Sequence, residues 1–155
     1  MASCVVASPF GNLCLTCQEH GVTGIDMTDA PLLPPREPLL IACAEQLAAY
    51  FAGDLRCFDL PLVPSGTSFQ QKVWQALTEI PYGETRSYGD IARQIGRPQA
   101  CRAVGGANHR NPILIVVPCH RVVGADGSLT GYGCGLDVKA WLLAHEKKYA
   151  SKASI

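Results

Sequence analysis

A cysteine and a histidine stand side by side at Cys119 and His120, directly after an apolar run that Pro118 ends. The run, residues 113–117, is rich in β-branched side chains, which predicts a strand buried on both faces. Because proline has no N–H to donate to a strand ladder, we expect the chain to leave the sheet at Pro118. Cys119 would then lie where a buried strand opens, and a thiol beside a base can act as a nucleophile.

The sequence around Cys119 decides between two interpretations of this residue. Taken alone, a cysteine at a strand end is most simply a small apolar core residue, since free cysteines are among the most buried residue types. However, the Pro-Cys-His-Arg motif has companions on both sides. Upstream are Arg102-Ala-Val-Gly-Gly-Ala and then Asn111-Pro. Downstream are Gly131-Tyr-Gly-Cys-Gly and a predicted helix that ends in Trp141-Leu-Leu-Ala-His-Glu146.

In this order, these motifs closely resemble those of the O6-alkylguanine-DNA alkyltransferases. The resemblance is strong from about residue 68 to residue 146 and weak over residues 8–11. It implies an enzyme that repairs DNA by moving the alkyl group of O6-alkylguanine onto a cysteine, here Cys119, with O4-alkylthymine as an open second substrate. A thioether is stable, so the protein would be a single-turnover methylated-DNA–protein-cysteine S-methyltransferase, consumed as it reacts.

The resemblance also implies roles for residues near Cys119. Glu146 would hold His120, and His120 would act through a water on the Cys119 thiol. Tyr132 would assist the departing base, and Asn111 would tie the recognition helix to the active-site strand. The substrate pocket would be lined by Val122, Gly131, Gly133, Cys134 and Gly135. Of these, Cys134 departs from the glycine that is usual in the family, and its side chain would narrow the pocket.

Residues 87–107 predict two short helices joined by a Gly-Arg-Pro turn, which makes a helix-turn-helix candidate. The second helix carries small residues that leave one face nearly bare, which suits a narrow minor groove. Tight packing inside the protein is the alternative explanation. The resemblance favours the groove, with Arg102 entering the base stack and Tyr88 promoting rotation of the nucleotide, because O6 is out of reach inside a duplex. The predicted DNA contacts are Arg102, Tyr88, Ala103, Gly105, Gly106 and Arg121.

The charge is distributed unevenly along the 155 residues, although the net charge is zero. Residues 1–63 hold two Arg against seven Asp and Glu, a net charge of −5, and residues 64–155 hold eleven Lys and Arg against six, a net charge of +5. The stretch 84–121 is rich in arginine, a residue suited to phosphate contact. Its six arginines are 86, 93, 97, 102, 110 and 121.

The pattern of apolar residues predicts an α+β protein with two lobes. Residues 1–63 would form an N-terminal lobe with a small β-sheet and a helix over residues 39–51. Residues 64–150 would form a mostly helical DNA-binding and alkyl-acceptor domain, with the helix-turn-helix and a short buried strand at the active site. A capping box at Ser68-x-x-Gln71 would begin its first helix. Residues 151–155 would be a tail.

The sequence suggests neither a cofactor nor a metal. It has no phosphate-cradling glycine loop and no HExxH motif. Cys14, Cys17 and His20, with Cys4 nearby, could be zinc ligands. On a strand, however, Cys14 and Cys17 would point to opposite faces, and no second pair follows.

The expected setting is the cytoplasm. No stretch reaches the roughly 20 apolar residues of a membrane helix, and the N-terminus lacks the features of a signal peptide. The eight cysteines are therefore expected to be reduced. The expected partner is double-stranded DNA containing O6-alkylguanine, bound by a monomer without a membrane or an obligate protein partner.

Two other functional classes remain as alternatives. A DNA-binding module without chemistry would share the helix-turn-helix, but non-catalytic relatives lack the acceptor cysteine that this chain has. A cysteine hydrolase would use Cys119 and His120, but adjacent residues rarely place a base correctly against a nucleophile. Mapping a permanent adduct on the protein after exposure to alkylated DNA would separate all three.

Overall fold

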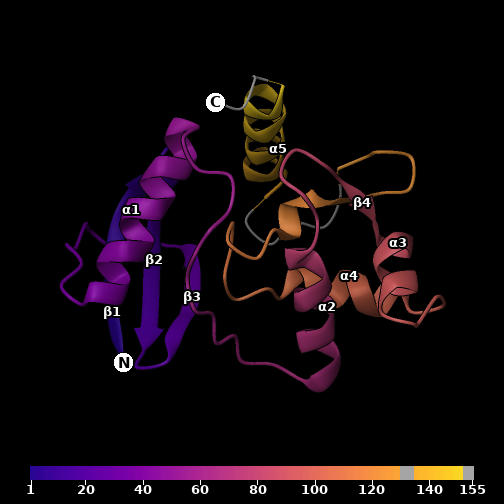
Figure 1. The fold of residues 1–155 in the computed structure, drawn as a ribbon, viewed down its shortest axis with the longest axis horizontal. Coiled ribbons are helices and arrows are strands. Elements are labelled where there is room, and N and C mark those ends of the chain that lie inside the picture. Colours follow the sequence, from indigo (N-terminus) through magenta and orange to yellow (C-terminus); the bar gives the residue numbers. More distant parts are fainter. Residues whose placement is uncertain (130–134, 152–155) are drawn as a thin grey trace. The chain divides into compact units, whose positions relative to one another are not determined.

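The computed structural model describes residues 1–129 and 135–151 and divides the chain into two compact units (Figure 1). The first unit consists of residues 1–65 with 112–114, and the second of residues 66–111 with the chain from 115 onward. The predicted α+β class is confirmed: one unit contains a sheet covered by a helix, and the other is mostly helical. None of the described helices is long and apolar enough to cross a membrane.

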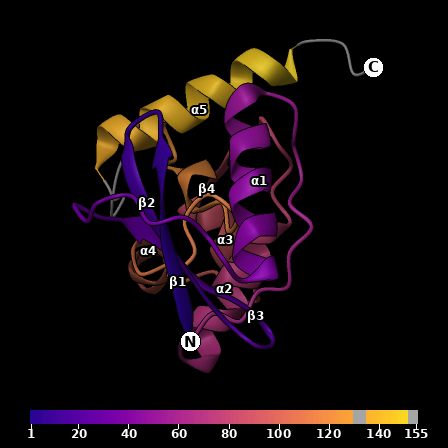
Figure 2. The same cartoon turned by 90° about the vertical axis from the view of Figure 1, so that its left-hand side faces the viewer.

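The first unit is a three-stranded antiparallel sheet with one helix on it (Figure 2). Strands β1 (Ala2–Ser8), β2 (Gly11–Gln18) and β3 (Gly21–Met27) pair in that order, and α1 (Pro38–Ala52) packs on all three. In the central strand β2 alternate residues are buried, namely Leu13, Leu15 and Cys17, as a sheet with one covered face requires. The helix begins with proline in its first turn and ends at Gly53, whose φ of 86° lies in the left-handed region that glycine favours. The buried residues of α1 are Leu40, Cys43, Leu47 and Tyr50.

Three cysteines of the first unit are core residues, whereas Cys57 is exposed. Cys4, Cys17 and Cys43 are buried between the sheet and α1, while Cys14 is half-buried. Burial, with smaller contributions from Cys4 and Cys17, raises the pKa of Cys43 to about 12, so this thiol is neutral at physiological pH. Within residues 1–129 and 135–151, no three or more His, Cys, Asp or Glu side chains are grouped so that they could hold a metal ion.

The second unit is built from four helices around short extended segments. They are α2 (Ser68–Thr78), α3 (Tyr88–Gln94), α4 (Cys101–His109) and α5 (Leu136–Ala150), with the single-turn 3-10 helix η1 (Cys119–Arg121) between α4 and α5. Strands β4 (Arg86–Ser87) and β5 (Val122–Val123) pair in parallel. Helices α2 and α3 both pack on α4. This arrangement places the helix-turn-helix pair, α3 and α4, on a helical support.

The capping box of α2 lies one residue earlier than predicted. The side chain of Thr67 accepts a hydrogen bond from the Gln70 N–H at 3.1 Å, and Gln70 Oε1 accepts one from the Thr67 N–H at 2.9 Å. Threonine and serine both cap helices, and two glutamines follow them at the same spacing, so the sequence allows either register. Helix α3 has its own capping box, made by Ser87 and Asp90.

The strand predicted over residues 113–117 is wrong. Only Ile113 makes a β-bridge, to Ile25 of β3, and residues 114–116 form a turn in which Ile115 has a φ of 71°. The Asn111 side chain donates to the Val117 carbonyl at 2.8 Å across this turn. A buried turn needs the same apolar residues as a buried strand, so composition alone misled the prediction. The short buried strand near the site is β5 instead.

Residues 112–114 also differ from their predicted lobe. Through the bridge at Ile113 they group with the first unit, although we expected them in the C-terminal domain. Two backbone hydrogen bonds reinforce the bridge, from the Ile25 N–H to the Pro112 carbonyl at 3.0 Å and from the Leu114 N–H to the Ile25 carbonyl at 3.1 Å.

Candidate active site

Cys119 is the first residue of η1 and is 1% exposed. Its N–H donates to the Val117 carbonyl at 2.8 Å. Its carbonyl oxygen accepts two hydrogen bonds, one from the Val122 N–H and one from Asn108 Nδ2 at 3.3 Å. The nucleophile candidate therefore has its backbone fixed on both sides.

Two buried asparagines connect the end of α4 to this segment. Asn111 donates to the Val117 carbonyl and Asn108 donates to the Cys119 carbonyl, so the two bonds flank Pro118. Asn111 was among the predicted site residues, and its bond joins the end of α4 to the residue before Pro118. Asn108 was missed, although a signal was present: it lies four residues after Val104 on the buried side of α4, where an apolar residue is usual.

His120, Arg121 and Glu146 form a buried network between η1 and α5. His120 Nε2 lies 2.7 Å from Glu146 Oε2. Arg121 donates from Nε to Glu146 Oε1 at 2.8 Å and from NH2 to Oε2 at 2.9 Å, while its NH1 donates to the Ile80 carbonyl at 2.7 Å. The Gly83 N–H also donates to Glu146 Oε1, at 3.4 Å. A two-pronged pairing of this kind fixes the carboxylate in position.

The protonation states follow from these contacts. Burial alone would raise the pKa of Glu146, but the hydrogen bonds and charges of His120 and Arg121 bring it below its ordinary value. Burial lowers the pKa of His120, and the Arg121 and Lys139 charges add to this against the opposing effect of Glu146. Because the carboxylate is anionic, His120 Nε2 is the donor in their bond. The Nδ1 atom of His120 then has a lone pair and no hydrogen-bond partner among the described residues, which leaves it available as a base.

The position of Arg121 corrects the sequence-based expectation that it contacts DNA phosphate. Its side chain is buried, it pairs with Glu146, and its guanidinium carbon lies 5.7 Å from the centre of the Tyr82 ring. Its donors are therefore engaged inside the protein, where they fix the carboxylate that holds His120.

Lys139 is a second residue that the sequence analysis missed. It is fully buried on α5. With Leu142 and Glu146 it follows the i, i+3, i+7 spacing of one helix face, the face that Glu146 anchors to η1. Burial lowers the pKa of Lys139, and a charge interaction with Cys119 acts in the opposite direction. A cation at this position can stabilise a thiolate. The helical spacing with Glu146 was the signal that could have revealed it.

The predicted DNA contacts other than Arg121 lie on α3 and α4. Arg102, Ala103 and Gly106 are exposed on α4, whereas Gly105 is half-buried and faces Tyr88. A Cβ atom at Gly105 would lie 3.9 Å from the Tyr88 ring. Of the small residues of α4, Ala103 and Gly106 therefore leave its exposed face bare, and Gly105 allows close packing on α3. The hydrogen bond from Trp74 Nε1 to the Ala107 carbonyl, at 2.8 Å, fastens α4 to α2.

The predicted substrate pocket is only partly covered by the structure. Val122 is buried and pairs with Arg86 of β4, and Gly135 precedes α5 with a φ of 99°. The other predicted pocket residues, Gly131, Gly133 and Cys134, lie outside the described residues, as does Tyr132.

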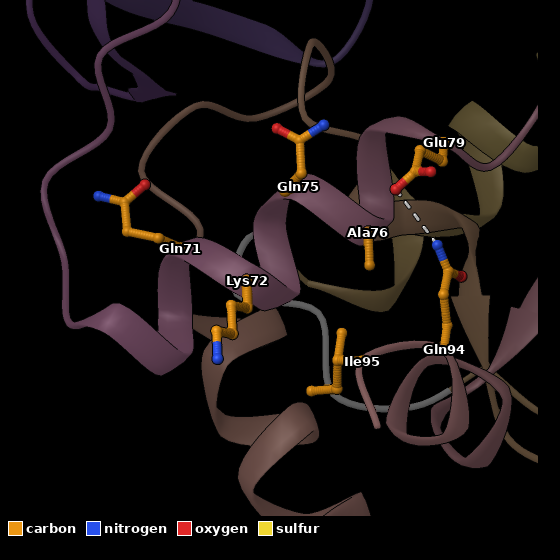
Figure 3. A pocket seen from close by; sticks show the side chains of 7 residues that line it. All are labelled: Gln71, Lys72, Gln75, Ala76, Glu79, Gln94 and Ile95. Carbon is orange, nitrogen blue, oxygen red and sulfur yellow. Dashed lines mark hydrogen bonds between the residues drawn. The ribbon is translucent and has the colours of Figure 1, made fainter. Parts of the chain in front are cut away.

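A surface hollow of about 480 Å³ lies elsewhere in the second unit, between α2 and the end of α3 (Figure 3). Gln94 donates to Glu79 across it at 3.3 Å. Its lining is mostly polar and includes neither Cys119 nor any residue bonded to Glu146. The lining residues are Gln71, Lys72, Gln75, Ala76, Glu79, Gln94 and Ile95.

The lowered pKa of His120 predicts acid sensitivity of the fold. Below the ordinary pKa of 6.5, the unfolded chain takes up a proton on His120 that the folded chain does not bind, so stability is full above this pH and falls on acidification. The depressed pKa of Glu146 adds a further loss below 4.5. We expect urea-unfolding midpoints to fall between about pH 7 and pH 5.5. The midpoint of His120→Gln should fall less over the same pH range. An equal fall in both proteins would show that His120 is not the source of the acid sensitivity.

Comparison with known proteins finds similarity to one family over nearly the whole chain. Residues 68–148 match the family described as 6-O-methylguanine DNA methyltransferase, DNA binding domain, and residues 3–64 match its ribonuclease-like domain. The methylated-DNA–protein-cysteine methyltransferase of Methanosarcina acetivorans is 50% identical, covering 92% of this chain and 96% of its own. That of Mycolicibacterium paratuberculosis is 55% identical, covering 94% and 92%.

Solved structures from the same family resemble this chain in fold and sequence. The Mycobacterium tuberculosis OGT in complex with DNA superposes with a TM-score of 0.86 at 51% identity, covering 94% of this chain and 92% of that one. The Mycobacterium tuberculosis O6-methylguanine methyltransferase gives 0.86 at 49% identity, covering 96% and 94%. The chain therefore belongs to the 6-O-methylguanine DNA methyltransferase family.

Proposed function

We propose that this protein repairs DNA by transferring the alkyl group of O6-alkylguanine to Sγ of Cys119, once per molecule. The observation that carries the proposal is the buried network beside the thiol. Arg121 fixes Glu146, Glu146 fixes His120, and His120 keeps Nδ1 available as a base one residue from Cys119. The relatives named above act on methylated DNA through a cysteine, which supports the same chemistry here.

The reaction is a displacement at the alkyl carbon. The Cys119 proton passes to His120 Nδ1, with a water as the relay, and the thiolate attacks the carbon bonded to O6. The sulfur–carbon bond forms as the carbon–oxygen bond breaks, and the departing guanine takes a proton, so that the thiol proton is finally accounted for on the base. The positive charge of Lys139 stabilises the Cys119 thiolate before the attack. The thioether that forms on Cys119 is stable, so the thiol is not regenerated.

Access to O6 requires the nucleotide to leave the duplex. The exposed residues Arg102, Ala103 and Gly106 on α4 support entry of this helix into the minor groove. Arg102 would fill the space that the flipped base leaves in the DNA stack. Tyr88, which faces Gly105, would press on the DNA backbone beside the flipped nucleotide. We infer that the substrate is double-stranded DNA, and we keep the expectation that a monomer binds it in the cytoplasm.

The direct test is adduct mapping. The protein is incubated with a duplex that contains one O6-methylguanine, digested, and its peptides are analysed by mass spectrometry. One methyl group per molecule on Cys119 is the expected result. Binding without any adduct would indicate a recognition module, and turnover of an ester or peptide substrate would indicate a hydrolase.

Arg102 provides a test of base flipping. We expect Arg102→Ala to slow transfer from duplex DNA by roughly 100-fold, because unstacking a base requires a few kcal/mol that the inserted side chain offsets. Transfer from free O6-methylguanine base should change little, since no extrusion is needed. Single-turnover rates on the two substrates make the comparison. Equal losses on both would show that Arg102 supports the fold or the pocket.

A further inference from the structure

The proline-rich segment between β3 and α1 is not used by the chemistry described so far. Residues 31–36 are Pro-Leu-Leu-Pro-Pro-Arg, and a further proline, Pro38, begins α1. Within this segment only Pro35 is half-buried, and the other five residues are exposed. Leu32 and Leu33 are 60% and 49% exposed, so two large apolar side chains face solvent. Exposed proline-rich segments serve either as stiff connections or as recognition motifs.

Covalent geometry restricts the backbone of this segment. Each proline fixes its own φ at about −65°, and the residue before a proline is pushed to an extended ψ. Between residues 31 and 37 these two rules leave only Leu32 and Arg36 unrestricted. Glu37, which precedes Pro38, has a φ of −73° and a ψ of 138°, values that match polyproline II. These restrictions favour a left-handed ridge with about three residues per turn.

Hydrogen bonds to the sheet hold the ridge in place and leave its other carbonyls open. The Val5 N–H donates to the Leu33 carbonyl at 2.9 Å, and the Leu33 N–H donates to the Val5 carbonyl at 3.0 Å. Just before the ridge, Asn12 Nδ2 donates to the Ala30 carbonyl at 3.1 Å. The other carbonyls of residues 31–35 accept no hydrogen bond from the described residues, so a partner's donors can reach them. A segment fixed in this way loses little conformational entropy when it is bound.

The spacing of the side chains matches a known mode of peptide recognition. With three residues per turn, Pro31 and Pro34 share one edge of the ridge, and Leu33 and Arg36 share the next. Two prolines at this spacing form the P-x-x-P pattern, which docks between the aromatic side chains of grooves such as those of SH3 domains. The ridge therefore presents two adjacent edges that suit an aromatic-lined groove.

Arg36 adds a charge at one end of the ridge and so defines what the partner must carry there. It is one of two arginines in residues 1–63, which contain no lysine. Its side chain is exposed and makes no hydrogen bond or ion pair with the described residues. A guanidinium with all its donors open pairs well with a carboxylate, often through two parallel hydrogen bonds. The groove that fits this ridge therefore has an acidic pocket beside its aromatic residues.

We propose that residues 31–36 are a docking site for an SH3-type domain of a partner protein. The aromatic-lined groove of that domain takes the edge formed by Pro31 and Pro34, and its acidic pocket takes Arg36. The site lies in the first unit and includes none of the residues assigned to alkyl transfer, so it does not depend on the proposed function. A stiff connection between β3 and α1 that binds no partner is the other outcome of the test.

The test titrates isotope-labelled SH3 domains with the intact protein and follows the domains by NMR. The probes are a panel of purified SH3 domains, each first shown to bind a synthetic peptide with the sequence P-x-x-P-x-Arg. We expect resonances of the groove to shift in at least one domain. Arg36→Ala should weaken this binding about tenfold or more, because it removes charge-assisted hydrogen bonds. The double variant Pro31→Ala/Pro34→Ala should weaken it to a similar extent, because it removes the edge that enters the groove.

Leu32→Ala is the matched control. Leu32 is an exposed apolar residue of the same segment, but it lies on the third edge of the ridge, away from the two edges that enter the groove. Binding should therefore stay within about twofold of the wild type. Arg36→Ala and Leu32→Ala should both keep the wild-type midpoint of urea unfolding, because both side chains are exposed.

Three results would overturn the proposal. The first is that no domain of the panel binds the intact protein, and the second is that Arg36→Ala binds as tightly as the wild type. The third is an equal loss in Leu32→Ala and Arg36→Ala, which would reduce the contact to unspecific burial of apolar side chains. Cys119→Ser protein should bind the SH3 domain like the wild type, so a failure of alkyl transfer and a failure of docking are told apart.

Discussion

Cys119→Ser is expected to abolish alkyl transfer, by a factor on the order of 10⁶, the size seen when a covalent nucleophile is removed. A serine hydroxyl at this position is a far weaker nucleophile than a thiolate, and the buried His120 network would have to ionise a much weaker acid. DNA binding should remain within a few-fold of the wild type, because the exposed residues of α4 are untouched by the change.

Two measurements check this result together. Transfer of a labelled methyl group from duplex DNA should be undetectable in the variant, and a gel-shift titration on the same duplex should show nearly unchanged affinity. Cys101→Ser is the control, since Cys101 is exposed at the start of α4. It should keep full transfer. Label recovered on Cys101 in the Cys119→Ser protein at the wild-type rate would show that the acceptor has been misassigned.

The sequence pointed to His120 and Glu146, which the structure pairs, but not to the buried residues that support them. Cys119, His120 and Glu146 could be found because the motifs that contain them resemble those of the alkyltransferase family. The two bonds from Arg121 to Glu146 could not, since a charged residue in an arginine-rich stretch looks the same whether it pairs with a carboxylate or with phosphate. Only the fold brings residues 25 positions apart together.

The errors in secondary structure have a similar cause. Residues 113–117 were predicted as a strand because burial selects apolar, β-branched residues in turns as well as in strands. The turn is closed by the Asn111 side chain and contains Ile115 at a positive φ, and neither feature can be read from composition. The helices were easier to predict, because apolar residues recur at helical spacing in α1 and α2 and a capping box begins α2. Asn108 and Lys139 were missed because each is a polar residue at a position where the helical pattern predicts an apolar one.

The second large effect concerns the buried pair Arg121 and Glu146. Glu146→Leu is expected to destabilise the protein by about 3–5 kcal/mol, because it leaves the Arg121 guanidinium buried without its carboxylate. It should also slow transfer by roughly 10²–10⁴-fold, since His120 loses the group that sets its tautomer and orientation. Urea unfolding and single-turnover transfer measure the two effects separately.

The double variant Arg121→Met/Glu146→Leu separates stability from catalysis. Replacing both members of a buried ion pair with apolar residues of similar size is often neutral for stability, so the double variant should recover most of the stability that Glu146→Leu loses. Its transfer rate should stay as low as that of Glu146→Leu, because His120 still lacks its carboxylate. If transfer recovers along with stability, Glu146 acts only on the fold. If stability does not recover, the loss arises from packing around α5 rather than from the unpaired charge, and the network would then be less important to the fold than its bond lengths suggest.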